Sequence, residues 1–276
     1  MLGLTGSVND RLWLFLATLG YLASAGWGLY ALSSQRPLAN RGAFVLIAIA
    51  FVLHTVFLQE RGQAIQHCPI TNLFETLAFF SWSLVLTYMV VGPAYRMSIL
   101  GAFTAPVVFL INAFALAAPI DLPGKLPQLG WQLELHATLA LLGLGVLGVA
   151  AMAGIAYLIQ ERQLKRHVLT AWFYSLPNVG RLEQVQQRVL ILGFVIFSAG
   201  TILGFFIPHR GPDDWVKIAW SAAVWCLYAV LVGVLALGRL SHKKTALLSV
   251  AGYVFILLTF WGINSLSEAH VVPHEG

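Results

Sequence analysis

The sequence predicts an all-α, polytopic integral membrane protein, a bundle of about eight transmembrane helices. Hydrophobic residues make up 59% of the chain and charged residues only 10%, whereas soluble domains carry about 25% charged residues. The apolar residues also form continuous runs of about 20 residues, the length that crosses a bilayer core of about 30 Å. These runs do not alternate between apolar and polar residues, which excludes a transmembrane β-barrel.

Eight apolar runs are long enough to span the membrane, and each is expected to be a helix because a spanning backbone must satisfy its own hydrogen bonds. In chain order, the predicted spans cover residues 12–32, 42–59, 72–91, 97–118, 134–160, 188–208, 215–238 and 246–265. They form a single transmembrane domain over residues 1–276. The first run has no signal-peptide cleavage pattern and is therefore interpreted as a span.

Local signals support the boundaries of two spans. Pro69, Thr71 and Asn72 precede the third span, and Asn72 and Glu75 have the spacing of a capping box at a helix start. The fifth span is expected to continue beyond the membrane through the sequence QERQLKRH, whose charges indicate a solvated helix end. Cys226 lies inside the seventh span as a small packing residue, since two cysteines are too few for a disulfide framework.

Lysine and arginine counts predict the orientation. Loops after the first, third, fifth and seventh spans hold eleven of these cations, and the opposite side holds four: Arg11, Arg61, Lys125 and Arg210. Positive residues favour the cytoplasmic side, so both termini are predicted to lie outside a bacterial inner membrane, with residues 161–187 as the main cytoplasmic loop. The same distribution assigns the net charge of +5 to cytoplasmic loops and not to binding of nucleic acid.

Ionisable residues inside the spans lie toward the predicted outer side. His54, Glu75, His136 and Lys217 belong to four different helices, and six of the eight histidines are on this side. An ionisable group in a bilayer costs about 2.5–3.5 kcal/mol on insertion scales and usually faces the bundle interior. The four residues could therefore converge on a polar chamber. Ordinary alternatives are a snorkelling lysine, a capping glutamate, an interfacial His136 and a structural His54.

Several histidines without a thiolate pair suit a metal or haem. Transition-metal transport usually requires carboxylates or soft ligands clustered within the membrane. A channel or transporter for a small cation would likewise require water-lined carboxylates. The spans offer too few of these groups, so haem is the favoured ligand.

Four segments, in the correct order, resemble the CcsA/ResC family of cytochrome c assembly proteins. They are HCPITNLFETLAFFSW from residue 67, WQLELHATLALLGLGVLGVAAMAGIAYLIQERQLK from 131, DWVKIAWSAAVWCLYA from 214 and FWGINSLSEAH from 260. The second segment is still more similar to HemX/YpjD-like relatives of that family. The resemblance covers about residues 42–270 and matches the eight-helix layout.

The resemblance implies a haem-binding protein of cytochrome c biogenesis that moves or presents haem b at the outer face of the membrane. It implies that His136 and His270 are outer haem-iron ligands and that His54 is an intramembrane ligand. Trp215 and Trp220 are expected to pack against the haem. Lys217 or Arg210 could pair with its propionates, because cations complement carboxylates best where water is scarce, and Glu75 is a further predicted contact. No catalytic residue is implied, because haem attachment would need an apocytochrome c and a second assembly subunit. Membrane lipid is the remaining expected partner.

The chain departs from the family pattern in its seventh-span loop. Where the family has WGxYWxWDPKETW, this chain has FIPHRGPDDWVKIAW, so the paired tryptophans are missing and Ile218 replaces a glutamate. These differences favour an alternative function, that of a HemX/YpjD-like non-enzymatic regulatory or scaffolding protein in tetrapyrrole synthesis or cation tolerance. The external histidines favour haem binding.

Overall fold

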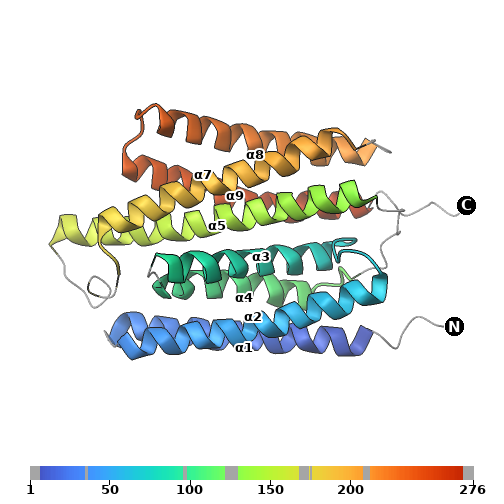
Figure 1. Ribbon diagram of the computed structural model, residues 1–276, viewed down its shortest axis with the longest axis horizontal. Helices are drawn as coiled ribbons and strands as arrows, with labels where there is room; N and C mark the ends of the chain where they lie inside the picture. Colours follow the sequence, from blue (N-terminus) through green and yellow to red (C-terminus); the bar gives the residue numbers. More distant parts are fainter. Residues whose placement is uncertain are drawn as a thin grey trace, which may run out of the picture.

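The computed structural model describes residues 7–34, 37–95, 98–121, 130–167, 174, 176–207 and 212–269. Over these residues the chain is helical and has no β-strand, which confirms the all-α prediction (Figure 1). The helices are α1 (Ser7–Ser34), α2 (Pro37–Ile65), α3 (Leu73–Ala94), α4 (Gly101–Ala117), α5 (Trp131–Arg166), α7 (Val179–Phe205), α8 (Pro212–Ala236) and α9 (His242–Ala269), with the 3₁₀ turn η1 (Ser98–Leu100) before α4.

Seven of these helices are long and apolar enough to cross a membrane, so the chain is a multi-pass membrane protein. Helix α4 is shorter than the predicted span 97–118. It has 17 residues, with Pro106 inside it, and a rise of 1.5 Å per residue gives a length of about 26 Å. That is less than the bilayer core of about 30 Å, because the first residues of the predicted span form the separate turn η1.

The helices form two halves that meet mainly through α3 and α5. Helices α1 to α4 pack together in one half, and α5 packs against both α7 and α9 in the other. Helix α8 lies at the edge, against α7 and α9 (Figure 1). Helix α5 is the most enclosed of the helices that could cross the membrane, since 78% of its most apolar 18-residue stretch is buried.

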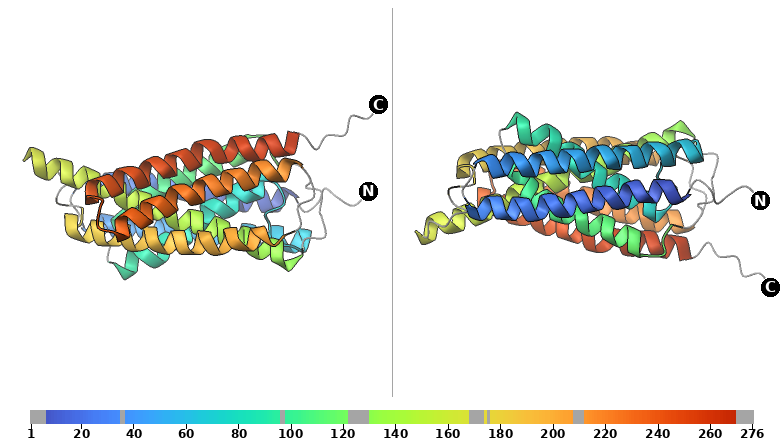
Figure 2. Two further views of the ribbon diagram at one scale, coloured as in Figure 1. Left: turned by 90° about the horizontal axis from the view of Figure 1, so that it is seen from above. Right: turned by 90° about the horizontal axis from the view of Figure 1, so that it is seen from below.

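Helix α1 begins and α9 finishes at the same end of the bundle (Figures 1 and 2). We call this end the predicted outer end, after the orientation that the cation counts predict. At the opposite end, α5 projects beyond the bundle, as the sequence QERQLKRH predicted (Figure 2). An ion pair of 2.6 Å between Lys165 Nζ and Glu161 Oε1 stabilises the projecting turn, and His167, at φ 53°, ends the helix.

Candidate functional site

His136 lies in the second turn of α5, near the predicted outer end, and its ring rests on α7. Its Nδ1 donates a hydrogen bond of 2.7 Å to the carbonyl oxygen of Gly200. A Cβ atom added at Gly204 would lie 2.6 Å from Cε1 of the same ring, so only glycine leaves room for the imidazole at this position. The carbonyl oxygen of Gly200 therefore keeps the proton on Nδ1 of His136, and the absence of a side chain at Gly204 leaves space for the ring.

This tautomer leaves Nε2 as the nitrogen that could bind a metal. With the proton on Nδ1, the neutral ring keeps its lone pair on Nε2, and a hydrogen bond to a backbone carbonyl is a common way to orient a ligating histidine. His136 is half-buried, and its only hydrogen bond to a described residue is made by Nδ1. Nε2 is therefore available to an external ligand.

His54 lies in the other half of the molecule and is fully buried. The hydroxyl of Tyr21 is 3.2 Å from its Nδ1, whereas its Nε2 makes no hydrogen bond within the part of the chain that the structure describes. Phe57 and Phe74 separate the ring from the charged groups of the predicted outer end. The ring centroids of His54 and Phe57 are 6.1 Å apart, those of Phe57 and Phe74 are 5.8 Å apart, and the Arg61 guanidinium lies over Phe74.

Glu75 is buried at the start of α3, where protein groups satisfy both of its oxygens. Its Oε1 accepts a hydrogen bond of 2.8 Å from Arg61, and its Oε2 accepts bonds from the backbone N–H and the hydroxyl of Thr71. The side chain of Asn72 accepts from the backbone N–H of Glu75, as the predicted capping box requires. These contacts explain the burial of Glu75 without a ligand.

Sequence reasoning missed the partners of Glu75. Arg61 also bonds to Asp10 at 3.0 Å and to Asp121, and Arg11 lies 3.5 Å from Asp121. These groups come from the start of α1, the end of α2 and the residues after α4. The signal available in the sequence was the presence of opposite charges at span ends on one predicted side, but no pattern showed which ends are neighbours.

The loop between α2 and α3 is attached to α5 near His136. His67 Nδ1 lies 3.0 Å from Glu134 Oε1, and Cys68 Sγ lies 3.8 Å from the hydroxyl of Thr138. Burial, reinforced by the charge of Glu134, raises the pKa of the Cys68 thiol, although the hydrogen bond with Thr138 offsets part of this effect. His67 thus holds the α2–α3 loop against the start of α5, close to His136.

The residues predicted on α8 have different surroundings. Trp220 Nε1 donates to the hydroxyl of Thr259 at 2.8 Å and its ring packs on Phe260, so this side chain joins α8 to α9. Trp215 and Lys217 are exposed, and the Lys217 ammonium has no hydrogen bond or ion pair with a described residue. Arg210 and His270 lie outside the described residues.

Among the described residues, His54, Glu75, His136 and Lys217 have separate surroundings and do not converge on one polar chamber. His54 and Glu75 belong to the half built from α1 to α4, His136 lies between α5 and α7, and Lys217 is exposed on α8. The physical reason is that Arg61 neutralises Glu75 locally, while Lys217 needs no buried partner at an exposed helix end. Within the described parts of the chain, no three His, Cys, Asp or Glu side chains are arranged to hold a metal ion.

The chain is similar to known proteins over most of its length. The family model described as "Cytochrome C assembly protein" matches residues 70–270. Protein HemX of Bacillus subtilis is 24% identical over 241 residues, covering 84% of this chain and 87% of the relative. The cytochrome c biogenesis protein CcsA of a Synechococcus strain is 26% identical over 283 residues, covering 91% of each chain. CcsA of Marchantia polymorpha is 23% identical over 304 residues, covering 92% of each.

Proposed function

Because the chain belongs to the cytochrome c assembly protein family, we propose that it binds haem b as a cargo in cytochrome c biogenesis and presents it at the outer face of a bacterial inner membrane. The observation that carries this proposal is the packing and hydrogen bonding of the His136 ring against α7. A ring held against Gly200 and Gly204, whose Nε2 makes no hydrogen bond to a described residue, suits an axial ligand of haem iron. The name of the CcsA relatives supports the same process.

The other predicted haem contacts follow from the same arrangement. Helix α9 packs against α5 and finishes at the predicted outer end, which supports His270 as the second outer ligand. The exposed ammonium of Lys217 is suited to a haem propionate, as Arg210 would be, because charge-assisted hydrogen bonds to carboxylates are strong. His54 is proposed as an intramembrane ligand because its buried Nε2 makes no hydrogen bond to a described residue.

In this proposal, the residues of the chain coordinate and orient the haem. Forming the thioether bonds requires cysteine thiols from an apocytochrome c, and a second assembly subunit is the proposed source of the reductant that keeps them reduced. The function assigned to this chain is therefore that of a haem-holding component, and it includes no catalytic residue.

The test is the Soret absorbance of the protein purified from haem-replete cells. We expect His136→Ala to lose most of the band. Gly204→Val should do the same with the imidazole still present, because its side chain would displace the ring from Gly200. His167→Ala, at the far end of α5, and Gly233→Ala, which adds a Cβ in open space, are the matched controls. A Soret band that is unchanged in both site variants would rule out His136 as a ligand.

A HemX-like regulatory or scaffolding role is the second candidate. The specific observation in its favour is that Trp220 is used to pack α8 against α9, so it is not free to form an aromatic platform. HemX of Bacillus subtilis is also among the similar proteins. A colourless wild-type protein from haem-replete cells would support this role over haem presentation.

A further inference from the structure

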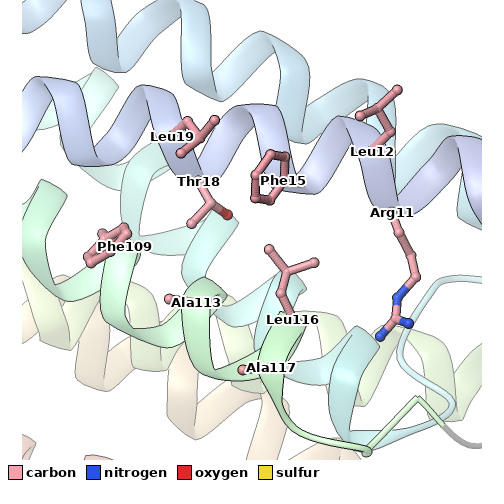
Figure 3. A pocket seen from close by; sticks show the side chains of 9 residues that line it. All are labelled: Arg11, Leu12, Phe15, Thr18, Leu19, Phe109, Ala113, Leu116 and Ala117. Atoms are coloured by element: carbon pink, nitrogen blue, oxygen red, sulfur yellow. The ribbon is translucent and has the colours of Figure 1, made fainter.

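A groove on the outer surface of the α1–α4 half has no assigned occupant. It has a volume of about 570 Å³ and runs between α1 and α4 (Figure 3). Phe15 and Leu19, one turn apart, form the α1 wall, while Ala113 and Ala117, also one turn apart, leave space on α4. The volume is in the range of about 300–1,000 Å³ that is typical of small-molecule sites.

The groove suits an apolar chain that enters from the bilayer. Phe15 and Leu19 are about half-exposed on a helix that is long and apolar enough to span the membrane, so the groove opens toward lipid. The hydroxyl of Thr18, which also lines it, donates to the carbonyl of Leu14 at 2.7 Å. The wall therefore presents no free hydroxyl donor, and its natural contact is hydrocarbon.

Arg11 lies at the predicted outer end of this groove (Figure 3). Its guanidinium lies over the Phe74 ring at 5.1 Å and its Nε is 3.5 Å from Asp121. Its two terminal amino groups make no hydrogen bond to a described residue, and the side chain is 40% exposed. A guanidinium with two free donors can bind a phosphate in bidentate geometry.

The charged groups around Arg11 indicate which phospholipid headgroup would bind here. In the described part of this end, Arg11 and Arg61 face three carboxylates, those of Asp10, Glu75 and Asp121. A phosphate alone would add negative charge to a cluster that already has an excess of it. A headgroup that carries a phosphate and an ammonium group complements both signs.

From these observations we propose that the groove binds one molecule of an aminophospholipid, of which phosphatidylethanolamine is the probe. One acyl chain lies between α1 and α4, the phosphate binds Arg11, and the ammonium group lies beside Asp121, the most exposed of the three carboxylates. This site is separate from the haem proposal, because it involves neither His136 nor His54.

The first experiment tests the groove. The purified full-length protein is stripped of lipid in detergent and mixed with equal amounts of phosphatidylethanolamine and phosphatidylglycerol that carry the same acyl chains, and native mass spectrometry counts the bound lipid. Ala113→Trp and the milder Ala117→Leu should each lose the single retained lipid. Ala223→Trp, on the exposed surface of α8, should keep it. Retention of the lipid by both folded groove variants would overturn the site.

The second experiment tests the headgroup. We expect the wild-type protein to prefer phosphatidylethanolamine by about fivefold, the effect of one unit charge at 4 Å in water. Asp121→Asn should reduce the preference to near unity. Arg11→Gln should weaken both lipids about tenfold, whereas Arg162→Gln at the far end should have no effect. Equal binding of the two lipids, or a preference for phosphatidylglycerol, would overturn the aminophospholipid assignment.

Discussion

Arg61 holds together three separate segments of the chain. Its guanidinium bonds to the carboxylates of Asp10, Glu75 and Asp121, and its side chain is only 14% exposed. A planar guanidinium can donate to several acceptors at once, which an ammonium group on a flexible stem cannot reproduce. Without Arg61, carboxylates that are largely enclosed by protein would lose their counter-charge.

We therefore expect Arg61→Ala to destabilise the protein by about 3–5 kcal/mol, the usual cost of removing one partner from a buried ion pair. Thermal unfolding in a mild detergent measures this as a lower melting temperature. Arg61→Lys should recover part of the loss because it restores charge without the planar geometry. Arg162→Ala, at an exposed site on α5, is the control, and an equal melting temperature for the two alanine variants would contradict the structural role of Arg61.

The raised pKa of Cys68 predicts its reactivity. Only the thiolate reacts with an alkylating reagent, so in a Cys226→Ser background the reaction rate should rise with pH and reach half its maximum above the pKa of an ordinary cysteine. Burial is the main cause, and the charge of Glu134 adds to it. Glu134→Gln should move the pH–rate profile to lower pH, and Thr138→Val should move it to higher pH. A profile unaffected by both changes would disprove these contacts.

At the scale of the helix, glycines determine how closely α5 and α7 approach. A Cβ added at Gly143 would lie 2.5 Å from the backbone nitrogen of Phe197, and one added at Gly200 would lie 2.6 Å from that of Ala140. These neighbours are backbone atoms, so a larger residue could be accommodated only if the helices separated. The same close approach places Gly200 and Gly204 against His136.

Gly143→Ala should therefore destabilise the protein by about 1–3 kcal/mol, as expected for overpacking. Because separating the helices would withdraw Gly200 from His136, the variant should also bind less haem. In contrast, Gly233→Ala places its Cβ in open space and should leave stability unchanged or raise it by up to about 1 kcal/mol through helix propensity. Melting temperatures compare the stability of the two variants. A Gly143→Ala protein as stable as wild type would show that α5 and α7 can accommodate the added methyl group.

The helices could be predicted from the sequence because hydropathy is a local property. Each predicted span overlaps a helix, and the side chain of Asn72 caps α3 by accepting from the backbone N–H of Glu75. The short α4 could not be predicted, because the turn η1 continues the same apolar run. The contacts of Arg61 and the carbonyl partner of His136 depend on which helices are neighbours, and a single sequence does not contain that information.

For the whole molecule, the orientation in the membrane decides what the site faces. The start of α1, the end of α9 and the seat of His136 lie toward the same end of the bundle. The opposite end carries the projecting turn of α5, with Arg162, Lys165 and Arg166. Since lysine and arginine favour the cytoplasmic side, the projecting turn should lie in the cytoplasm and His136 should face outward.

Thiol labelling can test this orientation. In a background with Cys68→Ser and Cys226→Ser, Gln63→Cys places a thiol on an exposed position near the end of α2, and Arg162→Cys places one on the projecting turn of α5. A membrane-impermeant maleimide applied to spheroplasts should label Gln63→Cys at once but label Arg162→Cys only after the membrane is permeabilised. The reverse pattern would place His136 near the cytoplasmic surface. Haem held there could not meet an apocytochrome outside, so the proposed presentation would fail even if His136 binds haem.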